Sequence, residues 1–291
     1  MSRSAGSNRR LLYYYDGWGP FLRGGTPEAL KESIDILTDS QITTVLLSPN
    51  IGQSVSYPSE VSQLSHWRPL SPETEADLKK GMGPFFTKVT HDVADLWRKQ
   101  GIDAFKLMSD HAQERGLEVF TSIRMNDTHM LGLDDGDGPY TDPFYRDHPE
   151  WRIPPMGGAG RHSGGALNYA IPEVRTHRLE LMEELLRRYD FTGLELDFVR
   201  GPPYFLSDRP DLEQDLYTRY PHFPRDLSEN GIPIMNEFVR EVRALTRRIG
   251  REKGTTITVC ARVPSTLSGC RRVGLDPAAW HLDGCLDFLT V

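Results

Sequence analysis

Six short apolar runs alternate with amphipathic segments along this chain, and this alternation limits its possible folds more than any other feature. Between the runs, hydrophobic residues recur at helical spacing, as at Leu30, Ile34 and Leu37. Short apolar runs that alternate with helices are typical of βα units and predict an α/β fold with a parallel sheet. The six predicted strands cover residues 11–15, 43–48, 117–124, 193–200, 256–262 and 286–291.

Residues that start or stop helices stand between these strands. Thr26 followed by Pro27 predicts a helix start, because threonine caps helix N-termini and proline suits the first helical position. Gly116 predicts the end of a helix over residues 103–115. Further helices are predicted over 89–99, 172–189 and 235–249, and a short one after Asp276.

The long loops after the predicted strands favour a TIM (β/α)8-type barrel over a doubly wound sheet. A glycine-rich phosphate loop after the first strand would favour the doubly wound sheet, and segment 16–20 (DGWGP) lacks the G-x-G-x-x-G spacing. Strands seven and eight have no sequence left, so we expect a barrel that lacks its last strands at the C-terminus. The predicted organisation is a disordered segment, 1–10, and a single partial barrel domain, 11–291. We expect this chain to be a portion of a longer protein or to close its edges through another subunit.

Charge and composition narrow the expected partners. The net charge is 34 − 41 = −7 and the isoelectric point is about 5.7, so nucleic acid is not the expected partner. No apolar run approaches the roughly 20 residues of a membrane helix, and membrane binding is not expected either. No signal peptide is visible, which indicates a cytoplasmic protein as the sequence is given, or a secreted or periplasmic one if a leader was removed. The three cysteines fit no zinc module, and no metal or other cofactor is predicted.

Two acidic residues share one face of the predicted strand over 193–200. Glu195 and Asp197 are two residues apart, so their side chains point to the same side, opposite to the apolar residues between and beyond them. Helices cover the apolar side of a barrel strand, which puts both carboxylates in the lumen. Such acids are costly unless they are paired or functional. They are therefore either catalytic or paired with an arginine of a neighbouring strand, and the second alternative suits the deeper Glu195 better than Asp197.

A second polar cluster follows the predicted strand over 117–124, with the members Arg124, Asn126, Asp127 and His129. We expect Arg124 to pair with Glu195 or Asp197 on the adjacent strand and to hold a carboxylate ionised. Asn126 and His129 are expected to hydrogen-bond a polyhydroxylated ligand, although each alone could be a satisfied loop residue.

Other predicted strand ends add polar or aromatic side chains, namely Asp16, Trp18, Asn50 and Arg262. Trp18 could stack on a sugar face or anchor its loop. Because the C-terminal ends of parallel strands meet at one edge of a sheet, we expect Asp16, Asn50, Asn126, Asp197 and Arg262 to line a common cleft.

Several motifs together resemble a known family. They are Arg124–His129, His148–Trp151, Leu167–Arg175 and Gly193–Arg200, followed by segments 274–280 and 284–290. In order and spacing they resemble the glycoside hydrolase-like family-10-like TIM-barrel proteins, a group of bacterial glycosidase candidates, over roughly residues 11–291. The segment around Asp197 also looks like the nucleophile strand of alpha-amylase-type barrels. Those barrels commonly carry an arginine two positions before the aspartate, where this chain has Glu195, and Arg262 holds the region of their usual acid.

The resemblance implies a carbohydrate-active barrel. Together with the acidic residues it predicts a glycoside hydrolase acting on an oligo- or polysaccharide, with Asp197 as the first catalytic carboxyl group. The second is Glu195, Asp127, Asp16 or a residue outside the chain. The predicted substrate-binding residues are Asp16, Trp18, Asn50, Arg124, Asn126, His129, Tyr169, Arg200 and Arg262.

Three alternatives remain open at this point. The first is a noncatalytic carbohydrate-binding barrel. The second is a metal-dependent sugar isomerase or lyase that uses Asp127, His129 and Asp197 with a divalent cation. The third is an inactive fragment. The oligomeric state, the sugar and the linkage are not predicted.

Overall fold

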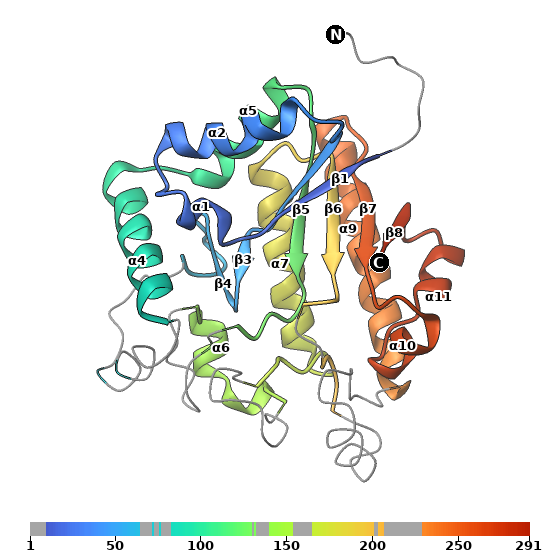
Figure 1. The fold of residues 1–291 in the computed structure, drawn as a ribbon. Helices are drawn as coiled ribbons and strands as arrows, with labels where there is room; N and C mark the ends of the chain where they lie inside the picture. The colour runs from blue at the N-terminus through green and yellow to red at the C-terminus, as the bar shows by residue number, and fades with distance from the viewer. Residues whose placement is uncertain are drawn as a thin grey trace.

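The computed structural model of the chain contains a six-stranded sheet in the order β1-β2-β5-β6-β7-β8, in which every neighbouring pair is parallel (Figure 1). Its strands are β1 (Leu12–Tyr15), β2 (Thr44–Leu47), β5 (Glu118–Arg124), β6 (Gly193–Asp197), β7 (Thr258–Arg262) and β8 (Phe288–Thr290). The six predicted strands are therefore confirmed. The structure describes residues 10–64, 72, 76, 83–129, 131, 140–153, 165–200, 203–206 and 229–291.

A short antiparallel hairpin that the sequence did not predict follows β2. It pairs β3 (Asn50–Ile51) with β4 (Ser54–Val55), and Gly52 turns the chain between them at a φ of 56°. A side chain at Gly52 would meet the backbone oxygen of Tyr140 at 2.7 Å, so both the turn and the close approach require glycine here. Asn50, expected in a loop after the second strand, thus lies in a strand.

The helices begin and end close to the predicted signals. Thr26 caps α2 by accepting a hydrogen bond from the Ala29 amide at 3.3 Å, and α5 stops before Gly116, which has a φ of 77°. The helices are α1 (Gly19–Leu22), α2 (Pro27–Thr38), α4 (Gly83–Gln100), α5 (Ala104–Glu114), α6 (Pro143–Asp147), α7 (Pro172–Arg188), α9 (Ile232–Lys253), α10 (Leu267–Arg272) and α11 (Pro277–Leu282), with 3-10 turns at Pro149–Trp151 and Glu229–Gly231.

The two faces of the sheet have different surroundings. Residues such as Val119, Leu194 and Val259 belong to the main apolar core with the buried sides of the helices. The opposite face curls on itself. This is evident from the guanidinium of Arg262 on β7, which lies 4.1 Å from the ring centroid of Tyr14 on β1 although three strands separate them. A curled, wholly parallel sheet with helices outside is a partial barrel. Within the described ranges it has six strands and does not close between β1 and β8.

The curled face is filled in two layers. A small apolar cluster of Leu46, Phe120 and Cys260 fills the layer toward the N-terminal ends of the strands, with Leu12, Tyr14 and Phe288 packed against it. Of the segment 1–10, only Arg10 is described, and its guanidinium pairs with Glu118 at 2.8 Å. The layer toward the C-terminal strand ends is polar. No helix of the described residues is long and apolar enough to cross a membrane.

Candidate functional site

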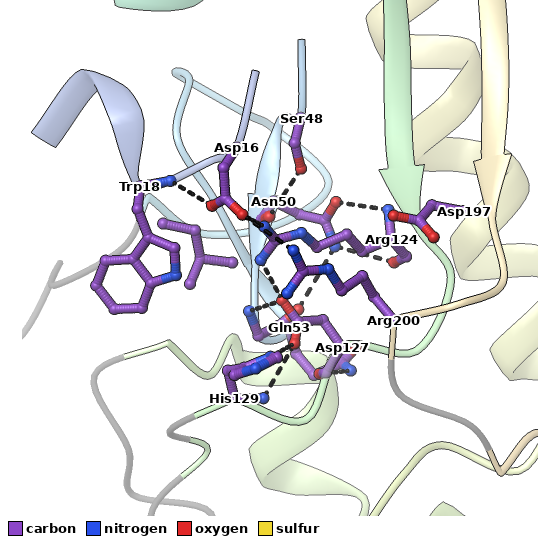
Figure 2. A network of polar contacts seen from close by, with 12 residues as sticks. Asp16, Trp18, Ser48, Asn50, Gln53, Arg124, Asp127, His129, Asp197 and Arg200 are labelled. Atoms are coloured by element: carbon purple, nitrogen blue, oxygen red, sulfur yellow. Dashed lines mark hydrogen bonds and ion pairs between the residues drawn. The ribbon is translucent and has the colours of Figure 1, made fainter. Parts of the chain in front are cut away.

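Polar side chains from three neighbouring strands converge at the C-terminal end of the curled face. Arg124, Asp197 and Arg262 occupy the same level, because β5, β6 and β7 pair in register at these residues. Figure 2 shows Arg124 and Asp197 together with side chains that follow β1, β2 and β6. Of the five residues expected to line a common cleft, Asp16, Asp197 and Arg262 lie at this end of the sheet, where Arg124 contacts Asp16 and Arg262 contacts Asp197. Asn50 and Asn126 are buried there and bond to backbone carbonyl groups.

Glu195 lies two residues before Asp197 on the same face of β6, and its carboxylate is contacted by three donors. One of its carboxylate oxygens accepts a hydrogen bond from Thr290 Oγ1 at 2.9 Å, and the other is contacted by Ser122 Oγ and by Arg262 Nη2 at 3.2 Å. The side chain is fully buried, and burial raises the pKa of Glu195 while Arg262 and the two hydroxyl donors oppose that rise. This is the arrangement expected of a buried acid paired with an arginine of the neighbouring strand.

Asp197 has fewer partners than Glu195. Its Oδ1 accepts a hydrogen bond from the Val199 amide at 3.0 Å, and its Oδ2 lies 3.5 Å from Arg262 Nη1. Burial raises the pKa of Asp197 above its usual value, while the charge of Arg262 and, to a lesser extent, the hydrogen bond from the Val199 amide oppose this rise. A buried carboxyl group at a strand end with an elevated pKa is typical of the acid–base groups of active sites.

Arg124 does not form the ion pair expected from the sequence. Its Nη1 lies 2.7 Å from Asp127 Oδ2, and its Nη2 lies 2.7 Å from Asp16 Oδ2, as an ion pair outside good hydrogen-bond geometry. Its Nε donates to the hydroxyl of Tyr14 at 2.9 Å. Arg124 and Arg262 lie on the two strands that neighbour Asp197. Because the Arg124 side chain turns toward β1, the ion pair that was expected between Arg124 and Asp197 is formed by Arg262 instead.

Asp127 joins the elements around Arg124. Besides Arg124, its carboxylate accepts hydrogen bonds from the Gly52 amide at 3.1 Å, the His129 amide at 3.1 Å and the His129 ring nitrogen Nδ1. Burial alone would raise the pKa of Asp127, but the hydrogen bond with His129 and the charge of Arg124 lower it to about 2. Asp127 is therefore fully buried and ionised at neutral pH, and half of the His129 side chain is exposed beside it.

Arg200 reaches over this cluster from the segment after β6. Its Nη2 lies 3.3 Å from Asp16 Oδ2, the oxygen that Arg124 also contacts (Figure 2). Arg200 and Asp16 each remain about one third exposed, with 37% and 36% of their side-chain surface accessible. Exposed pairs of this kind contribute little to stability and break easily. The mouth of the partial barrel thus carries an ion pair that spans the ends of β1 and β6.

The remaining predicted site residues are bonded within the protein. Asn50 exchanges two hydrogen bonds with the Arg124 backbone, both at 3.0 Å, which ties β3 to the end of β5. Asn126 joins the segments around Leu167 and Pro203, and the hydroxyl of Tyr169 donates to the Met125 carbonyl. These three side chains are buried. Trp18 is partly buried at the start of α1 and packs edge-on against Tyr140 at 5.0 Å.

Four members of the site were not singled out from the sequence. Ser122 and Thr290 donate to Glu195, Tyr14 contacts both arginines, and Gln53 Nε2 donates to the Asp127 carbonyl at 2.8 Å. The alternation of inward positions along a strand marks Tyr14, Ser122 and Thr290 in the sequence. No comparable signal marks Gln53, because the hairpin that positions it was not predicted.

The described residues of the site do not form a set of ligands for a divalent cation. Within the ranges that the structure describes, no group of three or more His, Cys, Asp or Glu side chains is placed to hold a metal ion. The three residues proposed for this role are separated in the network, because Asp127 and His129 bond each other and Asp197 bonds Val199 and Arg262.

The chain matches no family model, and no curated protein is similar to it in sequence. Solved structures with a similar arrangement include an alpha-amylase from Lactobacillus plantarum, at 14% identity and a TM-score of 0.46, with 96% of this chain and 52% of that one covered. They also include an alpha-galactosidase from Thermus thermophilus in complex with stachyose, at 13% identity and a TM-score of 0.45, with 98% of this chain and 44% of that one covered.

A third similar structure is a maltogenic alpha-amylase from Thermotoga neapolitana, at 12% identity and a TM-score of 0.42, with 87% of this chain and 46% of that one covered. The chain spans about half the length, or less, of these three structures. All three are glycoside hydrolases by their names. At such identities and TM-scores, the likeness assigns neither a family nor an activity to this chain.

Proposed function

We propose that this protein is a glycoside hydrolase that acts on an oligo- or polysaccharide at the C-terminal end of its curled sheet. Asp197 is the first of the two carboxyl groups that this reaction requires. One group must protonate the leaving oxygen and the other must act as a base or nucleophile. The elevated pKa of Asp197 suits the proton donor.

The observation that carries the proposal is the contrast between Asp197 and its buried acidic neighbours. Asp127 and Glu195, two of the three other acids named as candidates from the sequence, each accept contacts from three or four donors and are held in place by them. Asp197 accepts one backbone hydrogen bond and one ion pair at 3.5 Å. Asp16 also has three donors, which are the Trp18 amide, Arg124 and Arg200, but about one third of its side chain is exposed. It is therefore the candidate for the second carboxyl group.

The test is hydrolysis of a panel of oligo- and polysaccharides by the purified 291-residue chain, with release of reducing ends as the measurement. Asp197→Asn is expected to lower kcat by at least about 100-fold, because loss of an acid–base group typically costs that much or more. Ligand binding should persist. Asp110→Asn, an exposed site on α5, is the matched control and should keep full activity.

Each of the other outcomes identifies a rival. Saccharide binding with no turnover by the unaltered protein would support a noncatalytic carbohydrate-binding barrel. Turnover that a chelator abolishes and a divalent cation restores would support a metal-dependent sugar enzyme. Equal turnover by the Asp197→Asn variant would remove Asp197 from the reaction.

A further inference from the structure

Arg262 lies on the curled face of the sheet and contacts Tyr14, Glu195 and Asp197. It comes from the last residue of β7, and its two terminal nitrogens reach different carboxylates on β6. Nη2 lies 3.2 Å from Glu195 Oε2, and Nη1 lies 3.5 Å from Asp197 Oδ2. One guanidinium therefore bridges the two acids, and 20% of its side chain is exposed.

Glu195 and Tyr14 hold the guanidinium group of Arg262 more closely than Asp197 does. Glu195 is fully buried, and hydrogen bonds from Ser122 Oγ and Thr290 Oγ1 hold its carboxylate beside Arg262. The ring of Tyr14 lies 4.1 Å from the guanidinium carbon, well within the range of a cation–π contact. Glu195 and Tyr14 thus hold Arg262 from two sides, and the planar fork leaves its other nitrogen directed at Asp197.

We propose that Arg262 is a positioning residue: anchored by Glu195 and Tyr14, it orients the Asp197 carboxyl group and sets how readily that group releases its proton. This inference rests on the proposed role of Asp197. It assigns to Glu195 the task of holding Arg262 instead of a direct part in the reaction. It also replaces the expected role of Arg262 in substrate binding.

The charges around Asp197 determine the direction of the effect. Burial favours the neutral carboxyl group, and three arginines favour the ionised one: Arg262 on β7, Arg124 on β5 and Arg200 after β6. Glu195 on the same strand competes for Arg262, and Tyr14 on β1 and Cys260 on β7 also face this cluster. Asp16 and Asp127 pair with Arg124, and Asp16 also pairs with Arg200. Of the three arginines, Arg262 forms the ion pair with Asp197. Its removal should therefore leave the neutral form favoured further.

Two substitutions should move Asp197 in opposite directions. Arg262→Met keeps much of the side-chain volume and removes the charge, so the pKa of Asp197 should rise by about 1 unit, at the low end for a carboxylate beside an arginine. Glu195→Gln keeps the hydrogen-bonding shape and frees the guanidinium from its competitor, so the pKa of Asp197 should fall, by about half a unit. A purely structural role for either residue gives no reason for shifts of opposite sign.

The measurement is a pH titration of the full chain by NMR, with ¹³C-labelled aspartate carboxyl groups and Asp197→Asn to assign the signal. Arg240→Met, which removes an exposed arginine on α9, is the control and should leave the Asp197 titration unchanged. Arg262→Lys keeps the charge without the fork, so it should shift the titration less than Arg262→Met does. Arg262→Lys also replaces Arg262→Met if that variant fails to fold. The pKa of Asp197 should still rise in Arg262→Lys and fall in Glu195→Gln.

This titration does not depend on turnover, so its outcome is separate from the test of hydrolysis. An unchanged Asp197 pKa in Arg262→Met, or shifts of the same sign in Arg262→Met and Glu195→Gln, overturns the proposal. Where hydrolysis is measured, the kcat–pH profile of Arg262→Met should shift with the titration. If Arg262→Met instead raises KM and leaves the kcat–pH profile unshifted, Arg262 binds substrate and does not position Asp197.

Discussion

Asp127 contributes to folding through the charge that it keeps in the protein interior. Burial opposes that charge, yet His129 and Arg124 lower its pKa to about 2, against about 3.9 in an unfolded chain. The ionised carboxylate therefore stabilises the fold above about pH 4, and this contribution is lost as the pH falls through 2. The difference of nearly two pKa units corresponds to roughly 2–3 kcal/mol.

Asp127→Asn should lower the free energy of unfolding at pH 7 by at least roughly 2–3 kcal/mol, since it removes the charge and also turns an amide group toward donors. The loss should shrink as the pH is lowered from 4 toward 2, where the unaltered side chain also becomes neutral. Urea unfolding at several pH values measures this, with Asp110→Asn on the surface of α5 as the control. A deficit that is independent of pH would contradict the assignment of the charge to Asp127.

At the scale of single residues, the sequence predicted which side chains share the inner face of the sheet, but it did not predict which of them form ion pairs with each other. The period of two along a strand was enough to place Glu195 and Asp197 on the curled face. The prediction that Arg124 pairs with one of these acids was wrong, because Arg124 and Arg262 both lie beside Asp197 in the register of the sheet and Arg262 forms the pair. The choice depends on the side-chain direction of Arg124, which turns toward Tyr14 and Asp16. Such a choice requires three-dimensional contacts.

Among the helices, α5 has a cap that is tied to a second element. Asp103 Oδ1 accepts a hydrogen bond from the Lys106 amide at 2.9 Å, and the hydroxyl of Tyr189, after α7, donates to Asp103 Oδ2 at 2.9 Å. Asp103→Ala should cost about 2 kcal/mol, because it removes the cap and leaves the Tyr189 hydroxyl without this acceptor. Thr26→Ala, which removes only the exposed cap of α2, should cost about 1 kcal/mol.

Chemical denaturation of the two variants compares these costs directly. Asp103→Asn retains an acceptor oxygen for the cap and should recover most of the loss. If Asp103→Ala and Thr26→Ala cost the same, the bond to Tyr189 contributes nothing to stability.

Elements with local signals were predictable, and elements that depend on distant contacts were not. Thr26 and Gly116 mark helix ends through backbone chemistry within one turn, and both predictions are confirmed. The β3–β4 hairpin is only two residues long on each side, too short for a hydrophobic period. It is held by bonds to remote groups, such as the Tyr140 carbonyl and the Asp127 carboxylate, that no local pattern reveals.

For the molecule as a whole, the parallel order of the six strands follows from the βα alternation, since each crossover places the next strand alongside the last. The curl of the sheet depends on what fills its inner face. Phe120 on β5, Leu46 on β2 and Cys260 on β7 form one buried cluster there, and the rings of Phe120 and Phe288 lie 6.2 Å apart. Side chains from separate strands thus pack as a core and leave the polar layer above them for the site.

Gly193 is the position where this packing can be tested. It lies beside Phe120 in the register of β5 and β6, and a methyl group there would come within 2.5 Å of the Phe120 ring. Gly193→Ala should therefore destabilise the protein by about 1–3 kcal/mol through overpacking. Phe120→Leu alone should also destabilise it, by leaving a cavity.

The double variant, Gly193→Ala with Phe120→Leu, should lose less stability than the sum of the two single variants, because the added methyl group then enters the space that the ring vacates. Urea unfolding of all four proteins gives the coupling free energy, which we expect to be at least about 0.5 kcal/mol for residues in contact. The transitions should remain single, since the cluster joins β2, β5 and β7 into one core. Additive losses would show that Phe120 does not fill the space in front of Gly193, and that the inner face of the sheet is packed in another way.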